Sequence, residues 1–213
     1  MNWHEIPPIW QTCFELAWDA QREGSNPIAA LVADADGCVI TTGKSAVHAE
    51  LSGARSSHCE IAHAEVNALL ALDNRVHDKA TASSYTLFAT LEPCPLCFSA
   101  LYMSDVKKLA FAAKDRYGGS TNLLGTTPYL SRKPIEIDGP ADHLDEISVF
   151  LNVYCDLLRG GDVPRIVHDE FAKDYPAVVH RARELAPGDA LAISRLRYFK
   201  DAHAVITEAI SAR

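Results

Sequence analysis

The chain has 213 residues, of which 48% are hydrophobic and 23% are charged, and its formal net charge is −8. These fractions are ordinary for a globular protein, and the length fits one domain with additions or two small domains. The acidic balance and the lack of a dense run of lysine and arginine make a nucleic acid an unlikely partner.

The N-terminal sequence lacks the basic and apolar regions of a signal peptide, and no stretch approaches the length of a membrane span. We therefore expect a cytoplasmic protein that does not bind a membrane. Its six cysteines are expected to be free thiols or metal ligands rather than disulfides. Cys13, Cys38 and Cys155 have apolar neighbours and are predicted to be buried, whereas Cys59 is predicted to be a loop or helix-start thiol.

The first predicted element is a helix over residues 5–22, where apolar residues recur at helical spacing. Two β-rich runs follow, NPIAALVAD and GCVITTGKS, and the Asp-Gly between them is typical of a hairpin. Residues 63–72 predict a second helix with Val66, Leu69 and Leu70 toward the core. The later predictions are strand 85–91, helix 94–104, strand 107–113, a long loop 114–140, helix 145–158 and a largely helical segment 165–213.

A strand, a helix and a strand in this order predict a parallel pair with a right-handed crossover. We therefore predict an α/β fold with a three-layer core over residues 1–158 and a helical C-terminal extension over residues 159–213. The extension could pack on the core, cover a site or form a dimer interface. Its aromatic residues, among them Tyr175 and Phe199, are interpreted as core or interface residues.

Cys94 and Cys97 stand at C-x-x-C spacing at the start of a predicted helix, where both sulfurs could reach one metal and the helix dipole favours thiolate. The pair is compatible with a redox dithiol, a structural zinc site or a catalytic zinc site. A redox pair needs a thioredoxin-like order of elements, which this chain does not show. A structural zinc site needs four protein ligands, and His58 with His63 could complete one.

The catalytic alternative needs one histidine, two cysteines and an open position for water. His63 could supply the histidine, and the carboxylate of Glu65, two residues later, could take a proton from that water. Alone, His63 would more often be an ordinary helix-start residue. Together with Glu65, Pro93, Cys94 and Cys97 it forms the H-x-E…P-C-x-x-C signature of zinc nucleobase deaminases.

The segments HAEVNAL and TLEPCPLC resemble the two zinc motifs of the cytidine/deoxycytidylate deaminase superfamily. The resemblance is to the branch of guanine deaminases, yeast-type cytosine deaminases and bacterial tRNA adenosine deaminases. NPIAALVADADGCVI resembles the first hairpin of that branch, and KKLAFAAKDRYGGSTNLL resembles the strand and loop after the second zinc helix. The resemblance covers residues 5–135 and implies a cytidine-deaminase-like α/β/α core with a mixed sheet.

The resemblance also implies roles for individual residues. His63, Cys94 and Cys97 would hold Zn²⁺, and Glu65 would shuttle protons. The peptide between Pro93 and Cys94 would polarise the attacked group of the substrate.

Further residues are implied to line the substrate pocket. Ala29, with its small side chain, would lie against a flat heterocycle, and Asp115 in the following loop is another candidate. Members of this branch typically carry an asparagine where this chain has Ser45, whose hydroxyl offers fewer hydrogen bonds than an amide. Glu92 is interpreted as structural.

We therefore expect a zinc-dependent hydrolytic deaminase of a nucleobase, a nucleoside or a related amino-heterocycle, that is, a hydrolase of C–N bonds in cyclic amidines that releases ammonia. One alternative is a tRNA adenosine deaminase, although the charge and the lack of a basic C-terminal stretch speak against it. A second is a non-catalytic zinc-binding partner subunit of the same fold, against which Glu65 argues and which the missing asparagine keeps open. By analogy with the family, the protein would be a homodimer.

Overall fold

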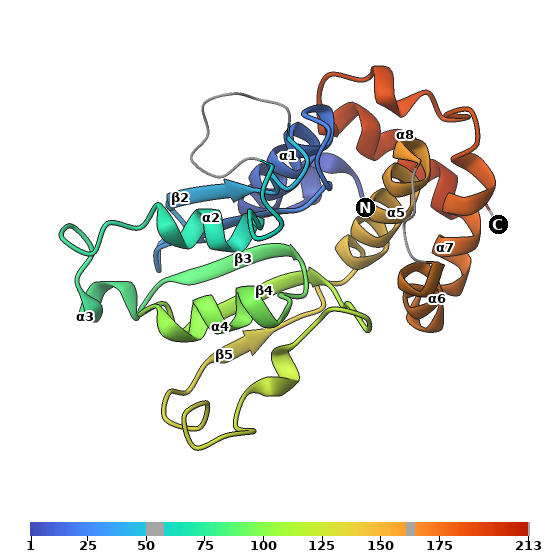
Figure 1. Cartoon of the computed structure of the whole chain (residues 1–213). Coiled ribbons are helices and arrows are strands. Elements are labelled where there is room, and N and C mark those ends of the chain that lie inside the picture. Colours follow the sequence, from blue (N-terminus) through green and yellow to red (C-terminus); the bar gives the residue numbers. More distant parts are fainter. Residues whose placement is uncertain (50–57, 161–164, 213) are drawn as a thin grey trace.

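The computed structural model describes residues 1–49, 58–160 and 165–212 (Figure 1). At its centre lies a five-stranded sheet with the order β2-β1-β3-β4-β5. Its strands are β1 (Ala29–Ala33), β2 (Val39–Lys44), β3 (Thr86–Leu91), β4 (Lys108–Ala113) and β5 (Glu136–Asp138). β1 pairs antiparallel with β2 and β3, whereas β3, β4 and β5 run parallel, so the predicted mixed sheet is confirmed.

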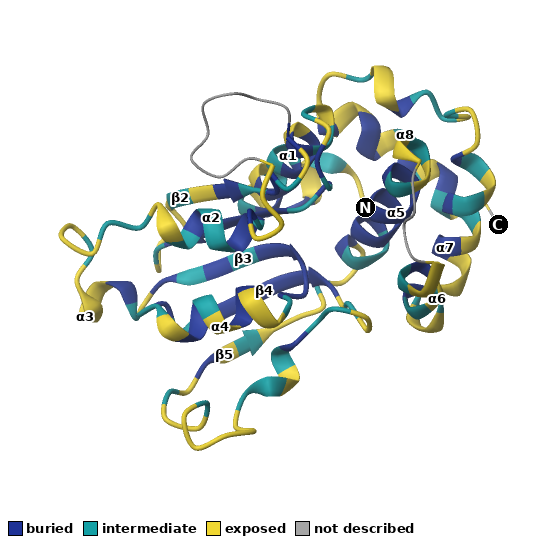
Figure 2. Cartoon of the chain, in the orientation of Figure 1, coloured by how far each residue is buried: buried dark blue, intermediate teal, exposed yellow. Residues whose placement is uncertain are grey.

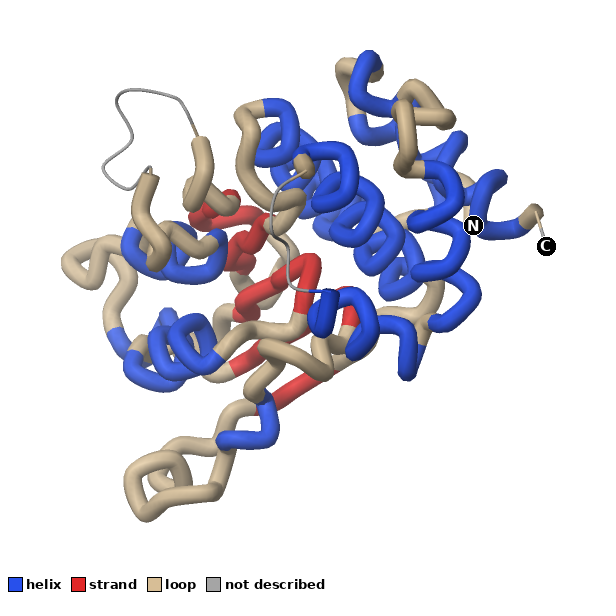
Figure 3. The backbone as a smooth tube through the Cα atoms, turned by 45° about the vertical axis from the view of Figure 1, so that its right-hand side comes forward, coloured by secondary structure: helices blue, strands red, loops and turns tan. Residues whose placement is uncertain are grey.

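Helices cover both faces of the sheet, as Figure 3 shows. On one face lie α1 (Pro8–Arg22) and α5 (Leu144–Arg159), and on the other lie α2 (Ala64–Leu70) and α4 (Pro95–Met103). The other helices are α3 (Lys79–Ala82), α6 (Arg165–Asp174), α7 (Pro176–Leu185) and α8 (Phe199–Ser211), with 3-10 turns at Trp3–Glu5, Thr121–Leu123 and Ile193–Arg195. The three-layer α/β/α core is thus confirmed.

Strand β1 is buried along its whole length because both of its faces are covered (Figure 2). Leu31 belongs to the hydrophobic cluster under α1 and α5, whereas Ala30 and Val32 belong to the cluster under α2 and α4. This alternation follows from the two-residue period of a strand.

Helix α2 lies unusually close to the sheet. A Cβ atom added to Gly43 of β2 would come within 2.1 Å of the Ala64 carbonyl oxygen. Only small side chains fit between the two elements, so Ala64 and Ala68 face the sheet. The prediction that Leu70 points toward the core is wrong, because its side chain is 76% exposed.

The cysteines separate into three environments, and all are free thiols. Cys13 and Cys155 are buried as predicted. The prediction for Cys38 is wrong: it lies exposed just after the hairpin turn, where the edge of the sheet leaves the residue uncovered. Cys59 is an exposed loop residue, as expected.

The C-terminal extension packs on the core, the first of the three possibilities that its sequence left open. Phe199 of α8 stacks on Phe14 of α1, with 5.3 Å between ring centroids. The indole N–H of Trp18 donates to the carbonyl of Leu196. α7 packs along α5 (Figure 1). Buried residues of the extension and of the sheet layer form one hydrophobic cluster, while the proposed boundary at residue 158 stays a prediction.

Throughout the described part of the chain, no helix combines the length and the apolar character needed to cross a bilayer.

Candidate active site

Three metal-competent side chains meet where α2 and α4 begin. His63 precedes the first residue of α2, Cys94 precedes the first residue of α4, and Cys97 lies in the first turn of α4. The His63 Nδ1 atom lies 3.4 Å from the Cys94 sulfur and 3.3 Å from the Cys97 sulfur, and the two sulfurs are 3.5 Å apart. One ion could therefore contact all three atoms.

The spacing of these atoms fits zinc. Tetrahedral Zn²⁺ with usual bond lengths holds two thiolates about 3.8 Å apart and a thiolate and an imidazole nitrogen about 3.6 Å apart. The distances in this chain are a few tenths of an ångström shorter. His58 is exposed and lies outside the cluster, so within the described residues no fourth protein ligand completes a structural zinc site.

The two thiols differ in pKa. A hydrogen bond with Cys97 lowers the pKa of Cys94 to about 4, with further help from His63, although burial opposes the shift. The hydrogen bond with Cys94, followed by burial, raises the pKa of Cys97. These opposite shifts favour Cys94 over Cys97 as the first of the two to lose its proton, and thiolate is the form in which each sulfur would bind a metal.

Glu65 completes the cluster from the first turn of α2. Glu65 is only 4% exposed, and burial raises the pKa of its carboxyl. A hydrogen bond connects it with Cys97. The structure thus places a proton-accepting group directly beside the metal-competent triad, as a shuttle would require.

His63, Cys94 and Glu65 border a cavity of about 130 Å³. The sequence predicted four of its lining residues besides Glu65, namely Ser45, His63, Cys94 and Asp115. The other residues around it are Asn26, Ile28, Val47, Ala64, Leu91 and Glu92. Four of the eleven lining residues are apolar and seven carry polar or titratable side chains, so the cavity offers many hydrogen-bonding groups beside a smaller apolar wall.

Two residues predicted to contact substrate, Ala29 and Pro93, are not among those that line the cavity. Ala29 is fully buried in the cluster under α1, and its neighbour Ile28 lines the cavity instead. Pro93 is buried, and its carbonyl accepts a hydrogen bond from the Ser120 amide at 2.9 Å. This bond ties the end of β3 to the loop after β4.

Ser45 is 3% exposed, and its hydroxyl lies 3.0 Å from the hydroxyl of Ser25. Sequence reasoning missed a second polar residue nearby. The amide oxygen of Asn26 accepts a hydrogen bond of 2.7 Å from Arg159 at the end of α5. The bond from Arg159 fixes the oxygen of this amide, so the Asn26 amide nitrogen is the atom that can act as a donor. The Asn-Pro pair that begins the first strand run was the signal in the sequence.

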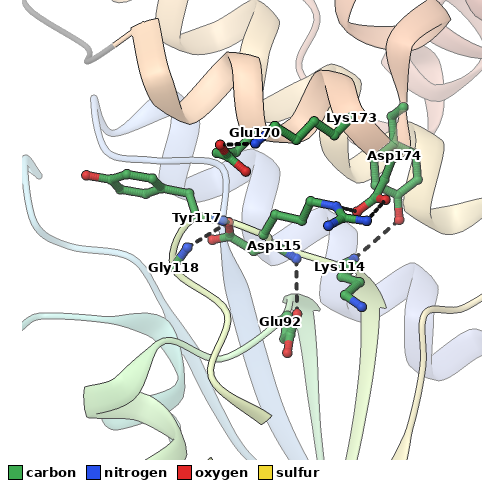
Figure 4. Close-up of polar contacts among 10 residues, drawn as sticks. Glu92, Lys114, Asp115, Tyr117, Gly118, Glu170, Lys173 and Asp174 are labelled. Carbon is green, nitrogen blue, oxygen red and sulfur yellow. Dashed lines mark hydrogen bonds and ion pairs between the residues drawn. The ribbon is translucent and has the colours of Figure 1, made fainter. Parts of the chain in front are cut away.

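Asp115 lies in the loop that follows β4, shown in Figure 4. Burial raises the pKa of its half-buried carboxyl. One carboxylate oxygen, Oδ1, accepts hydrogen bonds from the amides of Tyr117 and Gly118, each at 2.9 Å. The Asp115 amide in turn donates to Glu92, which is 6% exposed and anchors the loop from the end of β3.

Comparison with known proteins agrees with this geometry. Residues 3–113 match the family described as the cytidine and deoxycytidylate deaminase zinc-binding region. The chain belongs to this family. Zinc is accordingly its metal, and the triad has the donors that zinc needs.

Two curated relatives are tRNA-specific adenosine deaminases. The protein from Bacillus subtilis is 41% identical over 66 residues, and the protein from Haemophilus influenzae is 34% identical over 106 residues. These matches span 30% and 50% of this chain, and only 39% and 57% of the relatives' own lengths.

A solved structure of guanine deaminase from Nitrosomonas europaea is also similar, with 25% sequence identity and a TM-score of 0.52. The similarity covers 67% of this chain and 80% of that protein. It supports the cytidine-deaminase-like fold.

Proposed function

We propose that the protein is a zinc-dependent hydrolytic deaminase of a nucleobase, a nucleoside or a related amino-heterocycle, and that it releases ammonia. The observation that carries this proposal is the buried carboxyl of Glu65 beside the triad, at the wall of one cavity. In this proposal His63, Cys94 and Cys97 hold the zinc. The ion, when bound, supplies activation of a water molecule near neutral pH.

Glu65 would carry the protons of the reaction. A carboxylate oxygen of Glu65 takes a proton from the water and passes it to a ring nitrogen. It then takes the second proton from the hydroxyl group newly added to the ring carbon and delivers it to the departing amine. The raised pKa of Glu65 suits this exchange, because a carboxyl with greater proton affinity can both accept and return a proton.

The rest of the cavity would bind a flat ring. Ile28, Val47 and Leu91 offer apolar contact, while Asn26 offers a donor and Asp115 an acceptor. A planar ring with both an N–H group and an exocyclic oxygen or nitrogen would match these groups.

The strongest alternative keeps the chemistry and changes the substrate to a tRNA adenosine. The two tRNA-specific relatives favour it, whereas the net charge of −8 opposes it. The second alternative, a non-catalytic partner subunit, gives no reason to bury a carboxyl beside the triad.

We further propose that the protein is cytoplasmic, as expected from its sequence, and that it forms a homodimer, by analogy with the family. Exposed apolar side chains on and next to α2 and α4, among them Leu70 and Met103, supply surface that a second copy could cover.

The test is an ammonia-release screen with zinc-loaded protein over purines, pyrimidines, their nucleosides and triazines. Release from any of these compounds supports the proposal. A parallel assay measures inosine formation in bulk tRNA and tRNA binding by gel shift at physiological salt. Inosine formation without small-molecule turnover would favour the tRNA alternative, and silence in both assays would overturn catalysis altogether.

A further inference from the structure

We propose that Asp174 and Tyr175, at the junction of α6 and α7, are positioning residues that hold the loop bearing Asp115 as one wall of the substrate cavity. This inference rests on the proposed function only where it concerns substrate. It gives the C-terminal extension a role in the site, although the extension lies outside residues 3–113, which match the family.

The contacts of the junction fall on the two residues that flank Asp115. The Arg116 guanidinium forms a two-pronged ion pair with Asp174, at 2.6 Å from Nε and 2.7 Å from Nη2 (Figure 4). The Lys114 amide donates to the Tyr175 hydroxyl at 3.4 Å. A two-pronged pair fixes direction as well as distance. The loop is therefore held by a backbone amide immediately before Asp115 and by a side chain immediately after it.

The opposite side of the loop rests on Glu92. Glu92 accepts hydrogen bonds from the amides of Asp115 and Thr121, each at 3.2 Å, and from the Thr121 hydroxyl. A Cβ atom added to Gly119 would lie 2.4 Å from Glu92 Oε2, so the loop packs closely on this carboxyl. The loop is thus clamped between the end of β3 and the extension.

The clamp matters because of what Asp115 offers the cavity. The Oδ1 atom is engaged by the amides of Tyr117 and Gly118 within the same loop, so these bonds orient the carboxyl relative to the loop. They do not fix the loop relative to the triad. That second task falls to Glu92 and to the Asp174–Tyr175 junction.

An exposed ion pair adds little to global stability, and the Arg116 side chain is 46% exposed. Its loss should therefore act locally. A matched control exists on the same helix: Asp169 of α6 pairs with Arg183 of α7 and with Arg165, and among the described residues it forms no hydrogen bond or ion pair with the loop.

The first experiment is hydrogen exchange of the zinc-loaded protein. In the double variant Asp174→Asn/Tyr175→Phe, exchange at the amides of residues 115–121 should rise on the order of tenfold, as the loss of a charge-assisted hydrogen bond implies. Asp169→Asn should leave these amides unchanged. The charge swap Arg116→Asp/Asp174→Arg keeps an ion pair between the two positions and should restore protection of these amides. It therefore tests the contact even if the double variant fails to fold.

The second experiment uses the compound that releases most ammonia in the screen. The double variant should raise KM on the order of tenfold with kcat and zinc content nearly unchanged, because only the placement of a binding group is lost. Unchanged loop exchange, an equal effect from Asp169→Asn, or an unchanged KM would overturn the positioning role. If the wild type releases no ammonia, the proposed function fails, while the exchange comparison still decides whether the junction holds the loop.

Discussion

At the scale of single residues, Glu65 differs from most acidic side chains of the chain in its burial. Burying a carboxyl beside two thiols lowers stability, since burial disfavours its charged form. A role in the reaction would explain why the chain keeps it there. Its position on the first turn of α2 keeps it two residues from His63 and in hydrogen-bond contact with Cys97. The whole proposed proton path therefore depends on one side chain.

Replacing Glu65 with glutamine should retain zinc and lower kcat by at least about 100-fold, because an amide cannot take up and return the proton. Zinc content by atomic absorption and ammonia release measure the two effects. Glu136→Gln, at an exposed position in β5, is the matched control and should behave as the wild type. Near-normal turnover in zinc-loaded Glu65→Gln would remove Glu65 from the mechanism.

Replacing Cys94 with serine should reduce bound zinc well below one ion per chain, because one of the two sulfur ligands of the triad is lost. The control is Cys59→Ser, a change at an exposed cysteine outside the triad. Metal analysis after dialysis against a weak chelator distinguishes the two variants. Equal zinc in both would show that the metal lies elsewhere.

The residues of the triad could be predicted because each motif is local: one lies at the start of α2 and the other at the start of α4. The role of Asn26 could not, because Arg159, which orients its amide, lies 133 positions away in the sequence. Residue types thus revealed the metal site, whereas the substrate pocket depends on contacts that only the folded chain brings together.

At the scale of elements, the close approach of β2 and α2 sets the position of the site. Gly43 has no side chain, so the backbone of α2 can lie directly on it. The same helix begins beside His63 and carries Glu65. Any change in the spacing between β2 and α2 would move both residues relative to α4.

We expect Gly43→Ala to destabilise the protein by about 1–3 kcal/mol, as overpacking of a buried contact does, and to weaken zinc binding. The cause is the added Cβ atom, which would lie 2.1 Å from the Ala64 carbonyl oxygen. Urea unfolding and a competitive zinc titration measure the two effects. Thr42→Ala, at an exposed neighbouring position of β2, should change neither. A stable, fully zinc-competent Gly43→Ala variant would contradict this account.

Sequence patterns predicted the long elements of the core well. They failed for the orientation of Leu70 and for strand β5, and both failures have the same cause. Apolar residues predicted a core-facing Leu70, but the tight contact at Gly43 turns alanines toward the sheet. β5 has three residues, too few for any period, and it exists because β4 offers a parallel edge. In both cases a neighbouring element overrides the local pattern.

At the scale of the whole molecule, the extension and the sheet layer share one hydrophobic cluster. Phe199 stands at their junction: it is fully buried and stacks on Phe14. The amides of Phe199 and Lys200 donate to the Glu15 carboxylate of α1, so polar contacts support the same junction. The two parts should therefore unfold together.

Truncating Phe199 to alanine should cost about 3–5 kcal/mol of unfolding free energy, the usual range for a buried aromatic. Tyr198→Ala is the control, since that residue is 46% exposed, and it should change stability by less than about 1 kcal/mol. Urea denaturation followed by tryptophan fluorescence and by circular dichroism should give coincident transitions. Separate transitions for the two probes would show that the extension unfolds independently.

The triad and the Asp115 loop are positioned by different elements, and this separation bears on how such a protein could acquire new substrates. The triad depends on the starts of α2 and α4, whereas the Asp115 loop follows β4 and is braced by the extension. Mutations at the start of that loop, or in the helices behind it, should reshape recognition with little effect on the triad, whereas Ser120 and Thr121 also contact the residues just before Cys94. For directed evolution, a library confined to residues 114–117 and 170–175 would vary selectivity and leave those contacts in place.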